Sequence, residues 1–240
     1  MLPKKINLAI VAARQNSKGV KNKNLIKIKN NTITKIAVTI GLKSKKIDKI
    51  ILSSDSLKIL NSVPNNRNLI KLKRRKSLAK DKTPMLPVIQ DAIQYFENNT
   101  NKKYFVRNLV ILDPTSPLRK VSDVDESIKF FEKKKPDLLV SVHDAQHNPY
   151  FSIVEKKKNF FSLCKGNSIN PGSRQSVPRV YEINTAVWIY SRRAIFHIKK
   201  RIPKKTLIFL TPIERSIDID NNNDIQLINY YLKNNEKKNK

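Results

Sequence analysis

Cysteine is nearly absent from this chain, since Cys164 is its single cysteine in 240 residues. One thiol excludes an intramolecular disulfide and a cysteine-based zinc site, so we expect a reducing compartment, the cytoplasm. Long apolar runs are also missing, and none approaches the roughly 18 residues that span a bilayer. We therefore expect a soluble protein without a membrane partner. The N-terminus imitates a signal peptide, but Asn7 interrupts its apolar run and favours a first strand over residues 6–11.

Acidic and aromatic residues are scarce too. The chain has 49 Lys and Arg against 19 Asp and Glu, a formal net charge of +30, and 7% aromatic residues. Such a charge attracts polyanions. However, the basic residues are spread over many short clusters together with much Asn and Ile, and no aromatic ladder is interleaved with them, as single-stranded nucleic acids require. We interpret the charge as a compositional background and expect no nucleic-acid partner, with an RNA-binding protein as the alternative.

The apolar pattern alternates between short buried runs and helical spacing. Such alternation predicts a mostly parallel sheet with helices on both faces. The expected strands are 6–11, 49–53, 69–72, 106–112, 138–142, 186–190 and 207–210. The expected helices are 32–42, 56–63, 84–98, 122–134 and 224–232, with Ser122 as the N-cap and Asp125 as the N3 residue of the fourth. One domain would cover 1–232, with an excursion over about 144–182 that contains a hairpin (151–154 and 159–163). A disordered basic tail would cover 233–240.

Glycine occurs four times, and Gly19 lies in a cationic loop that directly follows the first strand. This loop, AARQNSKGVKNKN, contains one Arg and three Lys. Backbone N–H groups and cationic side chains after a buried strand are typical of phosphate pockets. The Walker motif GxxxxGK[ST] is absent. From spacing alone, a phosphate pocket and a basic surface loop both remain open.

Polar residues also follow other expected strands, at the sheet edge where α/β proteins bind ligands. These segments are 54–55, 113–119 (DPTSPLR) and 218–220. Asp218 and Asp220 alternate in an extended segment, so their carboxylates would share one side and suit Mg²⁺. An acidic surface strand is the alternative for this pair, and a capped loop is the alternative for 113–119.

Taken together, the motifs resemble one family. ARxxSKGxKNKN, SSD, RRKSLAKDKTP, LDPTSPLR, RQSVPRVYEIN and SIDID occur in the order seen in the acylneuraminate (CMP-nonulosonic acid) cytidylyltransferases. LPVIQDAI, NPYFSIVE and RQSVP are most similar to the branch that activates legionaminic acid. The resemblance implies a Rossmann-like nucleotide-diphospho-sugar transferase fold and a homodimer. It also implies transfer of CMP from CTP to the anomeric hydroxyl of a nonulosonic acid, legionaminic or N-acetylneuraminic acid, with release of pyrophosphate.

The resemblance also implies roles for individual residues. Arg14 with Lys21 or Lys23 would stabilise the leaving pyrophosphate, and Asp218 would take part in catalysis. Asp218 and Asp220 would hold Mg²⁺. The residues implied to bind the nucleotide are Ala13, Arg14, Ser17, Lys18, Asn22, Lys23, Arg75 and Ala79. The residues implied to bind the sugar are Asn22, Asp113, Thr115, Ser116, Arg174, Gln175, Tyr181 and Asn184.

Three positions depart from the family pattern. Asn16 and Thr185 stand where glycine is usual, and Asp113 stands where the sialic acid enzymes commonly have Gln. A carboxylate at position 113 repels an anionic sugar acid unless it meets a hydroxyl or amide donor. We therefore hypothesise that Asp113 selects a differently substituted sugar. A pseudaminic acid cytidylyltransferase and a catalytically inactive relative are the remaining alternatives.

Overall fold

The computed structural model describes residues 2–15, 20–80, 83–165, 172–198 and 200–238. A seven-stranded sheet in the order β11-β7-β10-β6-β1-β4-β5 forms its centre. All neighbouring strands pair in parallel except β10, which is antiparallel to both β6 and β7. The strands are β1 (Lys4–Ala12), β4 (Lys49–Ser54), β5 (Leu69–Lys73), β6 (Tyr104–Ile111), β7 (Leu138–Asp144), β10 (Tyr181–Ser191) and β11 (Thr206–Leu210).

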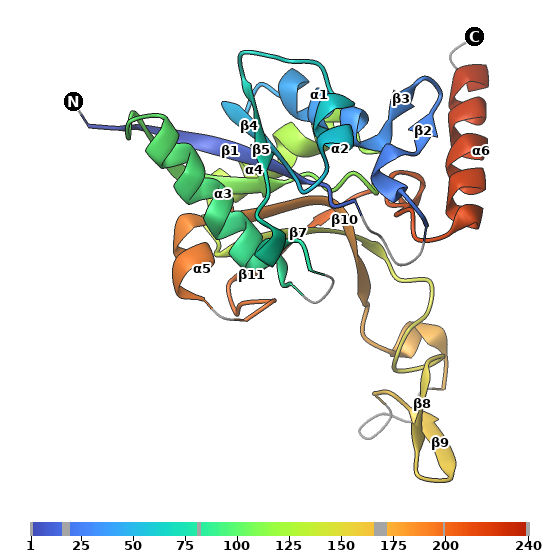
Figure 1. Ribbon diagram of the computed structural model, residues 1–240. Coiled ribbons are helices and arrows are strands. Elements are labelled where there is room, and N and C mark those ends of the chain that lie inside the picture. The colour runs from blue at the N-terminus through green and yellow to red at the C-terminus, as the bar shows by residue number, and fades with distance from the viewer. Residues whose placement is uncertain (1, 16–19, 81–82, 166–171, 199, 239–240) are drawn as a thin grey trace.

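Two apolar layers hold the helices to the sheet because the parallel strands are buried on both faces. In β1, Ala9 and Val11 face one layer, while Leu8 and Ile10 face the other. The first layer is covered by α1 (Ile33–Lys43), α2 (Leu57–Asn61) and α4 (Val121–Lys134), and the second by α3 (Met85–Asn99) and α5 (Arg192–His197) (Figure 1). The predicted parallel sheet with helices on both faces is confirmed. No helix within the described ranges is long and apolar enough to cross a membrane.

Several predicted boundaries were wrong. Helix α4 begins at Val121, and the carboxylate of Asp123 rather than that of Asp125 accepts the N-cap amide of Lys120, at 2.8 Å. Helix α6 (Asn222–Lys238) continues through most of the predicted disordered tail. Its apolar side packs on the small β2–β3 hairpin (Lys27–Ile28 and Asn31–Thr32). This packing stabilises a helix whose C-terminal sequence is too polar to be recognised locally.

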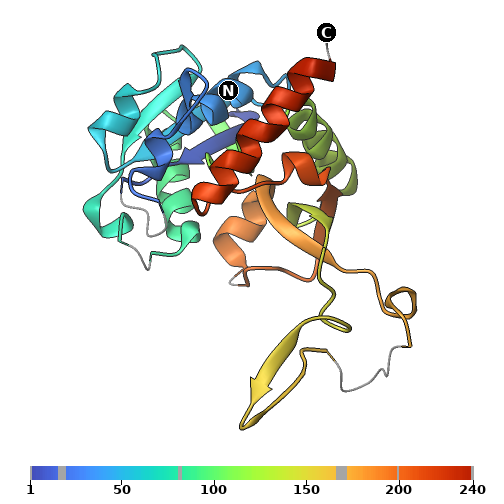
Figure 2. The same cartoon turned by 90° about the vertical axis from the view of Figure 1, so that its right-hand side faces the viewer.

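The predicted excursion lies between β7 and β10 and projects away from the sheet (Figures 1 and 2). Its hairpin is formed by β8 (Val154–Lys157) and β9 (Phe160–Leu163), so the first predicted strand, 151–154, was placed too early. Lys156 and Lys157 belong to β8, whereas Lys158 lies in the turn. Lys158 has a positive φ of 57°, which closes a tight connection to β9.

Candidate active site

The loops that follow β1, β5 and β6 meet the 213–220 segment at the carboxyl edge of the sheet. There they surround a cavity of about 440 Å³. Four Lys and Arg side chains line it against two carboxylates, so an anionic ligand is favoured. The lining residues are Ala12, Arg14, Lys23, Asn24, Arg74, Leu78, Lys80, Thr83, Met85, Val88, Asp113, Thr115 and Asp220.

The cationic loop contributes Arg14 and Lys23 to this cavity. The Lys23 side chain is only 13% exposed, and its Nζ lies 3.0 Å from Oδ1 of Asp220. Lys21 is exposed and does not line the cavity. The sequence left Lys21 and Lys23 as alternatives, and of the two only Lys23 reaches the candidate site.

Asn24, and not Asn22, presents its side chain to the cavity. Asn22 is an exposed residue in the left-handed conformation (φ 55°) and makes the turn before the short helix Lys23–Leu25. The side-chain amide of Asn24 donates to the carbonyl of Arg14 at 2.8 Å. The Thr34 hydroxyl donates to the Asn24 carbonyl at 2.6 Å. The first bond joins the two ends of the loop, and the second ties the loop to α1. Ser17, Lys18 and Asn16 lie outside the described residues.

The arginine after β5 that reaches the cavity is also not the one that the sequence resemblance implied. Arg75 is exposed and pairs with Asp91, whereas Arg74 is buried and lines the cavity. The guanidinium of Arg74 donates to Ser53 through Nε to Oγ (3.1 Å) and through Nη2 to the carbonyl oxygen (2.8 Å). Burial lowers the pKa of Arg74, and Asp55 opposes that shift. Ala13 is buried in the core and Ala79 lies beside the lining residues Leu78 and Lys80, so their side chains do not form the cavity wall.

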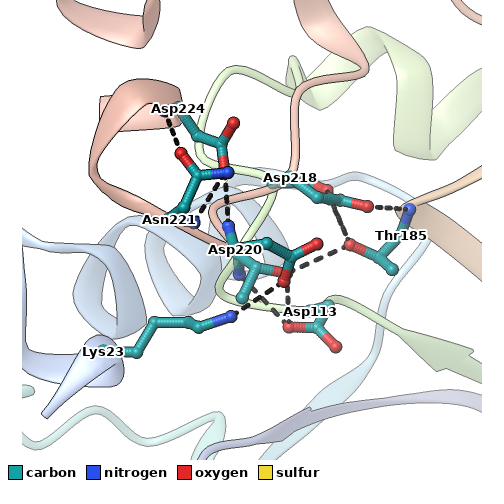
Figure 3. Close-up of polar contacts among 9 residues, drawn as sticks. Lys23, Asp113, Thr185, Asp218, Asp220, Asn221 and Asp224 are labelled. Carbon is teal, nitrogen blue, oxygen red and sulfur yellow. Dashed lines mark hydrogen bonds and ion pairs between the residues drawn. The ribbon is translucent and has the colours of Figure 1, made fainter. Parts of the chain in front are cut away.

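Hydroxyl groups from two separate segments converge on Asp218 (Figure 3). The hydroxyls of Ser116 and Thr185 both donate to Oδ1 of Asp218, and the backbone N–H of Thr185 donates to Oδ2 at 3.1 Å. Burial raises the pKa of Asp218; the Ser116 and Thr185 hydrogen bonds pull it back down, and the nearby Asp113 carboxylate raises it further. Asp218 is therefore held by three donors in a site that disfavours its charge.

Buried Arg119 binds backbone carbonyl groups next to the residues that hold Asp218. Its Nε donates to the Ser116 carbonyl at 3.0 Å, and its Nη1 donates to the Ala186 carbonyl at 2.5 Å. Burial lowers the pKa of Arg119 to about 10, and the carboxylates of Asp113 and Asp218 oppose the shift. The sequence showed Arg119 as one polar group of a loop. Its bridge between two distant segments becomes visible only in three dimensions.

Asp220 lies apart from Asp218. It is exposed and pairs with Lys23, while its backbone N–H donates to Asp224 at 2.7 Å (Figure 3). Within the described ranges, no group of three or more His, Cys, Asp or Glu could hold a metal ion. The two aspartates of SIDID therefore have different partners, and Asp220 is the one that lines the cationic cavity.

A second cavity of about 680 Å³ adjoins the first, and the two share Asp113 and Met85. Oδ1 of Asp113 accepts the backbone N–H (3.2 Å) and hydroxyl (3.0 Å) of Thr115. Most of the second cavity's lining is apolar. It consists of Pro84, Met85, Leu86, Pro87, Ile111, Asp113, Thr185, Trp188, Tyr190, Ala194, Ile198, Lys200, Arg201 and Pro203.

Several residues assigned to the sugar do not line either cavity. Asn184 is buried, and its side chain is bonded to Ser141 and Thr211. Gln175 lies in the excursion, Tyr181 is the first residue of β10, and both are exposed. Arg174 starts a short helix there, and its side chain lies outside the described part of the chain. Of the assigned set, Thr115 lines the cationic cavity, Ser116 is buried beneath it, and Asp113 borders both cavities.

The fold is shared with solved enzymes that use CTP. A CMP:2-keto-3-deoxy-manno-octonic acid synthetase complexed with CTP aligns with a TM-score of 0.64 at 11% identity, covering 97% of this chain and 99% of its own. A 4-diphosphocytidyl-2C-methyl-D-erythritol synthase from Anaerococcus prevotii aligns with a TM-score of 0.60 at 14% identity, covering 95% and 96%. These likenesses establish a Rossmann-like fold.

Sequence relatives are more specific. A CMP-N,N'-diacetyllegionaminic acid synthase of Campylobacter jejuni is 30% identical over 94% of both chains. The post-translational flagellin modification protein B of Campylobacter coli is 29% identical over 94% of both. An N-acylneuraminate cytidylyltransferase of Escherichia coli is 25% identical over 92% of this chain and 50% of its own length. The cytidylyltransferase family model matches residues 8–236, so the chain belongs to the cytidylyltransferase family.

Proposed function

We propose that this protein is a CMP-nonulosonic acid synthetase. It transfers CMP from CTP to the anomeric hydroxyl of a nine-carbon sugar acid and releases pyrophosphate. The observation that carries the proposal is the pair of adjoining cavities, one cationic and one mainly apolar, that share Asp113 and Met85. The named relatives that act on legionaminic and neuraminic acids support the same reaction.

In the cationic cavity, Arg14, Lys23 and Arg74 would hold the triphosphate. The sugar hydroxyl releases its proton to water as its oxygen attacks the α-phosphorus, and the bond from that phosphorus to the β-phosphate oxygen breaks as pyrophosphate leaves. Phosphoryl-type transfer is catalysed mainly by positioning and charge stabilisation. Lys23 suits the developing charge of the leaving group because its ammonium is largely screened from water. Leu78 and Thr83 line the same cavity and would contact the cytosine side of the nucleotide.

Magnesium fits this donor set in part. Mg²⁺ commonly uses one or two protein carboxylates together with substrate phosphates and water. Asp220 would be a direct ligand, since among described residues only Lys23 pairs with its carboxylate. Asp218 already accepts three hydrogen bonds and would have to share them. When bound, the ion would screen phosphate charge and lower the pKa of a coordinated hydroxyl.

The apolar lining of the second cavity favours a sugar that carries methyl and acetamido groups. Trp188, Ile198 and Met85 offer contact area to such groups and few partners to a hydroxyl-rich side chain. N,N'-diacetyllegionaminic acid has this character. Pseudaminic acid carries the same groups in another configuration and is the alternative substrate.

Pyrophosphate release tests the proposal directly. Purified protein is incubated with CTP, Mg²⁺ and a panel of legionaminic, pseudaminic and N-acetylneuraminic acids. We expect release that requires both CTP and a sugar acid. Binding of CTP without release would identify an inactive relative. Retention on RNA without any CTP-dependent release would favour the polyanion-binding alternative.

Asp113→Gln is expected to shift sugar preference. Asp113 borders both cavities, where it can accept a hydrogen bond from a sugar hydroxyl or amide. An uncharged Gln removes the repulsion toward other anionic sugars and loses a charge-assisted bond to the preferred one. We expect the ratio of kcat/KM for legionaminic over N-acetylneuraminic acid to fall about tenfold. An unchanged ratio would contradict a selective role for Asp113.

We also propose that the excursion mediates a homodimer. Its hairpin exposes Phe160 (79%) and Phe161 (67%) together with Val154, although isolated hairpins are marginally stable. A second copy of the chain would cover these side chains, and it would offer its own excursion, with Gln175, to a neighbouring cavity.

Replacing Phe160 and Phe161 together by Ser is expected to convert a dimer into a monomer. The paired change removes two large exposed apolar side chains without touching the sheet. Light scattering coupled to size-exclusion chromatography measures the mass directly. The control is Lys156→Ser on the same hairpin, which should leave the mass unchanged. A wild-type monomer, or a double variant that stays dimeric, would contradict the proposal.

A further inference from the structure

Thr185 occupies a backbone irregularity, lines the second cavity and contacts Thr115, which lines the first. Between Ile183 and Trp188 the pairing of β10 with β7 shifts, so that five steps along β10 match two steps along β7. Bulges of this kind redirect side chains and often lie beside functional sites. We propose that Thr185 positions Asp218 through its hydroxyl and limits the second cavity, here called the sugar cavity, through its methyl group. This proposal rests on the proposed function.

The irregular segment is fixed by its own hydrogen bonds. The side-chain oxygen of Asn184 accepts the backbone N–H of Ala186 at 3.1 Å and the Ser141 hydroxyl at 2.5 Å. The indole N–H of Trp188 donates to the Asn184 carbonyl at 2.8 Å. Arg119 holds the Ala186 carbonyl from below. Thr185 is therefore presented by a rigid segment, as a positioning residue requires.

The Thr185 hydroxyl is the centre of the hydroxyl cluster. Its Oγ1 lies 2.8 Å from Oγ of Ser116 and 3.2 Å from Oγ1 of Thr115, and it donates to Oδ1 of Asp218. Its backbone N–H takes the other carboxylate oxygen at 3.1 Å. Both oxygens of Asp218 are thus oriented by one residue. A glycine at position 185 would supply only the backbone N–H bond to Asp218.

The rest of the side chain faces the sugar cavity. Thr185 lines the 680 Å³ cavity together with Asp113 and Trp188. Because its Oγ1 is directed to the cluster, the Cβ–Cγ2 part is left to form the cavity wall. That methyl group reduces the space beside Asp113, where the reacting end of the sugar would lie.

Three substitutions separate the two roles. Thr185→Val keeps the volume and removes the hydroxyl, Thr185→Ser keeps the hydroxyl and removes the methyl, and Thr185→Gly removes both. Thr100→Val is the matched control, because among the described residues its hydroxyl bonds only to helix carbonyls at the end of α3. Steady-state kcat and the KM values for CTP and sugar are measured for each, with thermal unfolding to verify folding.

We expect Thr185→Val to lower kcat about 10- to 100-fold, the range for losing a hydrogen bond to a charged group, with KM for CTP unchanged. Thr185→Ser should restore kcat and raise the KM for sugar about fourfold, the value of one buried methyl group. Wild-type kcat in Thr185→Val would overturn the positioning role. An unchanged sugar KM in Thr185→Ser would overturn the cavity role. If Thr185→Val does not fold, the kcat of Thr185→Gly, which lacks the hydroxyl, is compared with that of Thr185→Ser, and equal values would overturn the positioning role. Wild-type protein that turns over no sugar acid would instead contradict the proposed function itself.

Discussion

Lys23→Met will lower kcat/KM for CTP by about 10²- to 10³-fold, the usual cost of removing one preorganised charge from a transition state. Lys23 is 13% exposed, and its ammonium projects into the cationic cavity beside Asp220. In that sheltered position its field is less screened than that of a surface lysine. Methionine preserves the length and much of the packing, so the loss should come from charge. The kinetics are read with CTP varied at saturating sugar.

Lys21→Met provides the matched control for this experiment. The two lysines lie in the same loop, two residues apart, but Lys21 is exposed and does not line the cavity. We expect its substitution to change kcat/KM for CTP less than threefold, in keeping with the weak effects of exposed charges. Equal losses in the two variants would show that the loop acts through general charge. A larger loss of kcat/KM in Lys21→Met than in Lys23→Met would show that Lys21, and not Lys23, contacts the triphosphate.

The layered architecture was predictable because it is encoded locally. Residues 6–11 and 106–112 are short apolar runs, and parallel strands buried on both faces take this form. Helix α3 was predicted to within one residue at each end because its apolar side chains recur with helical spacing and Pro84 precedes it. The last six residues of α6, 233–238, were missed because their sequence is polar, and the helix is stabilised by contacts of its earlier turns with the distant Ile28 and Ile33, of which local propensity contains no trace.

The site was predictable only to the level of loops. Motifs in family order located loops that line the cationic cavity, but the choice between neighbouring residues depends on backbone torsions. Asn22 adopts the left-handed conformation and is exposed, whereas Asn24 is buried against the cavity. Directly after β5, the Arg74 side chain is buried and the Arg75 side chain is exposed. The alternating pattern of SIDID likewise contains no sign that Ser116 and Thr185 hold Asp218, or that Asp220 pairs with Lys23.

Asp218→Asn will lower kcat by about 10²- to 10³-fold without destabilising the fold. We expect the catalytic loss because the charge of Asp218 lies next to Asp113 and Thr185, which line the proposed sugar cavity. Stability should be maintained or increased, because burial, the largest cause, raises the pKa of Asp218 in the folded protein. A raised folded pKa means that folding favours the protonated carboxyl, so the ionised form costs stability at neutral pH. Asn mimics the neutral form, and its oxygen can accept the Thr185 N–H while its amide donates to the hydroxyls, which also accept.

The pH dependence of unfolding isolates this contribution. As pH falls through the raised folded pKa of Asp218 toward its ordinary range, wild type gains the stability that ionisation had cost, and Asp218→Asn lacks that gain. Denaturant unfolding of both proteins across this range measures the difference. Asp48→Ala is the contrasting control, because Asp48 accepts the Asn7 N–H at 3.0 Å far from the carboxyl edge and should lose stability while retaining activity. A lower unfolding free energy for Asp218→Asn at neutral pH would show that the ionised carboxylate stabilises the fold, and its loss of activity would then have a structural cause.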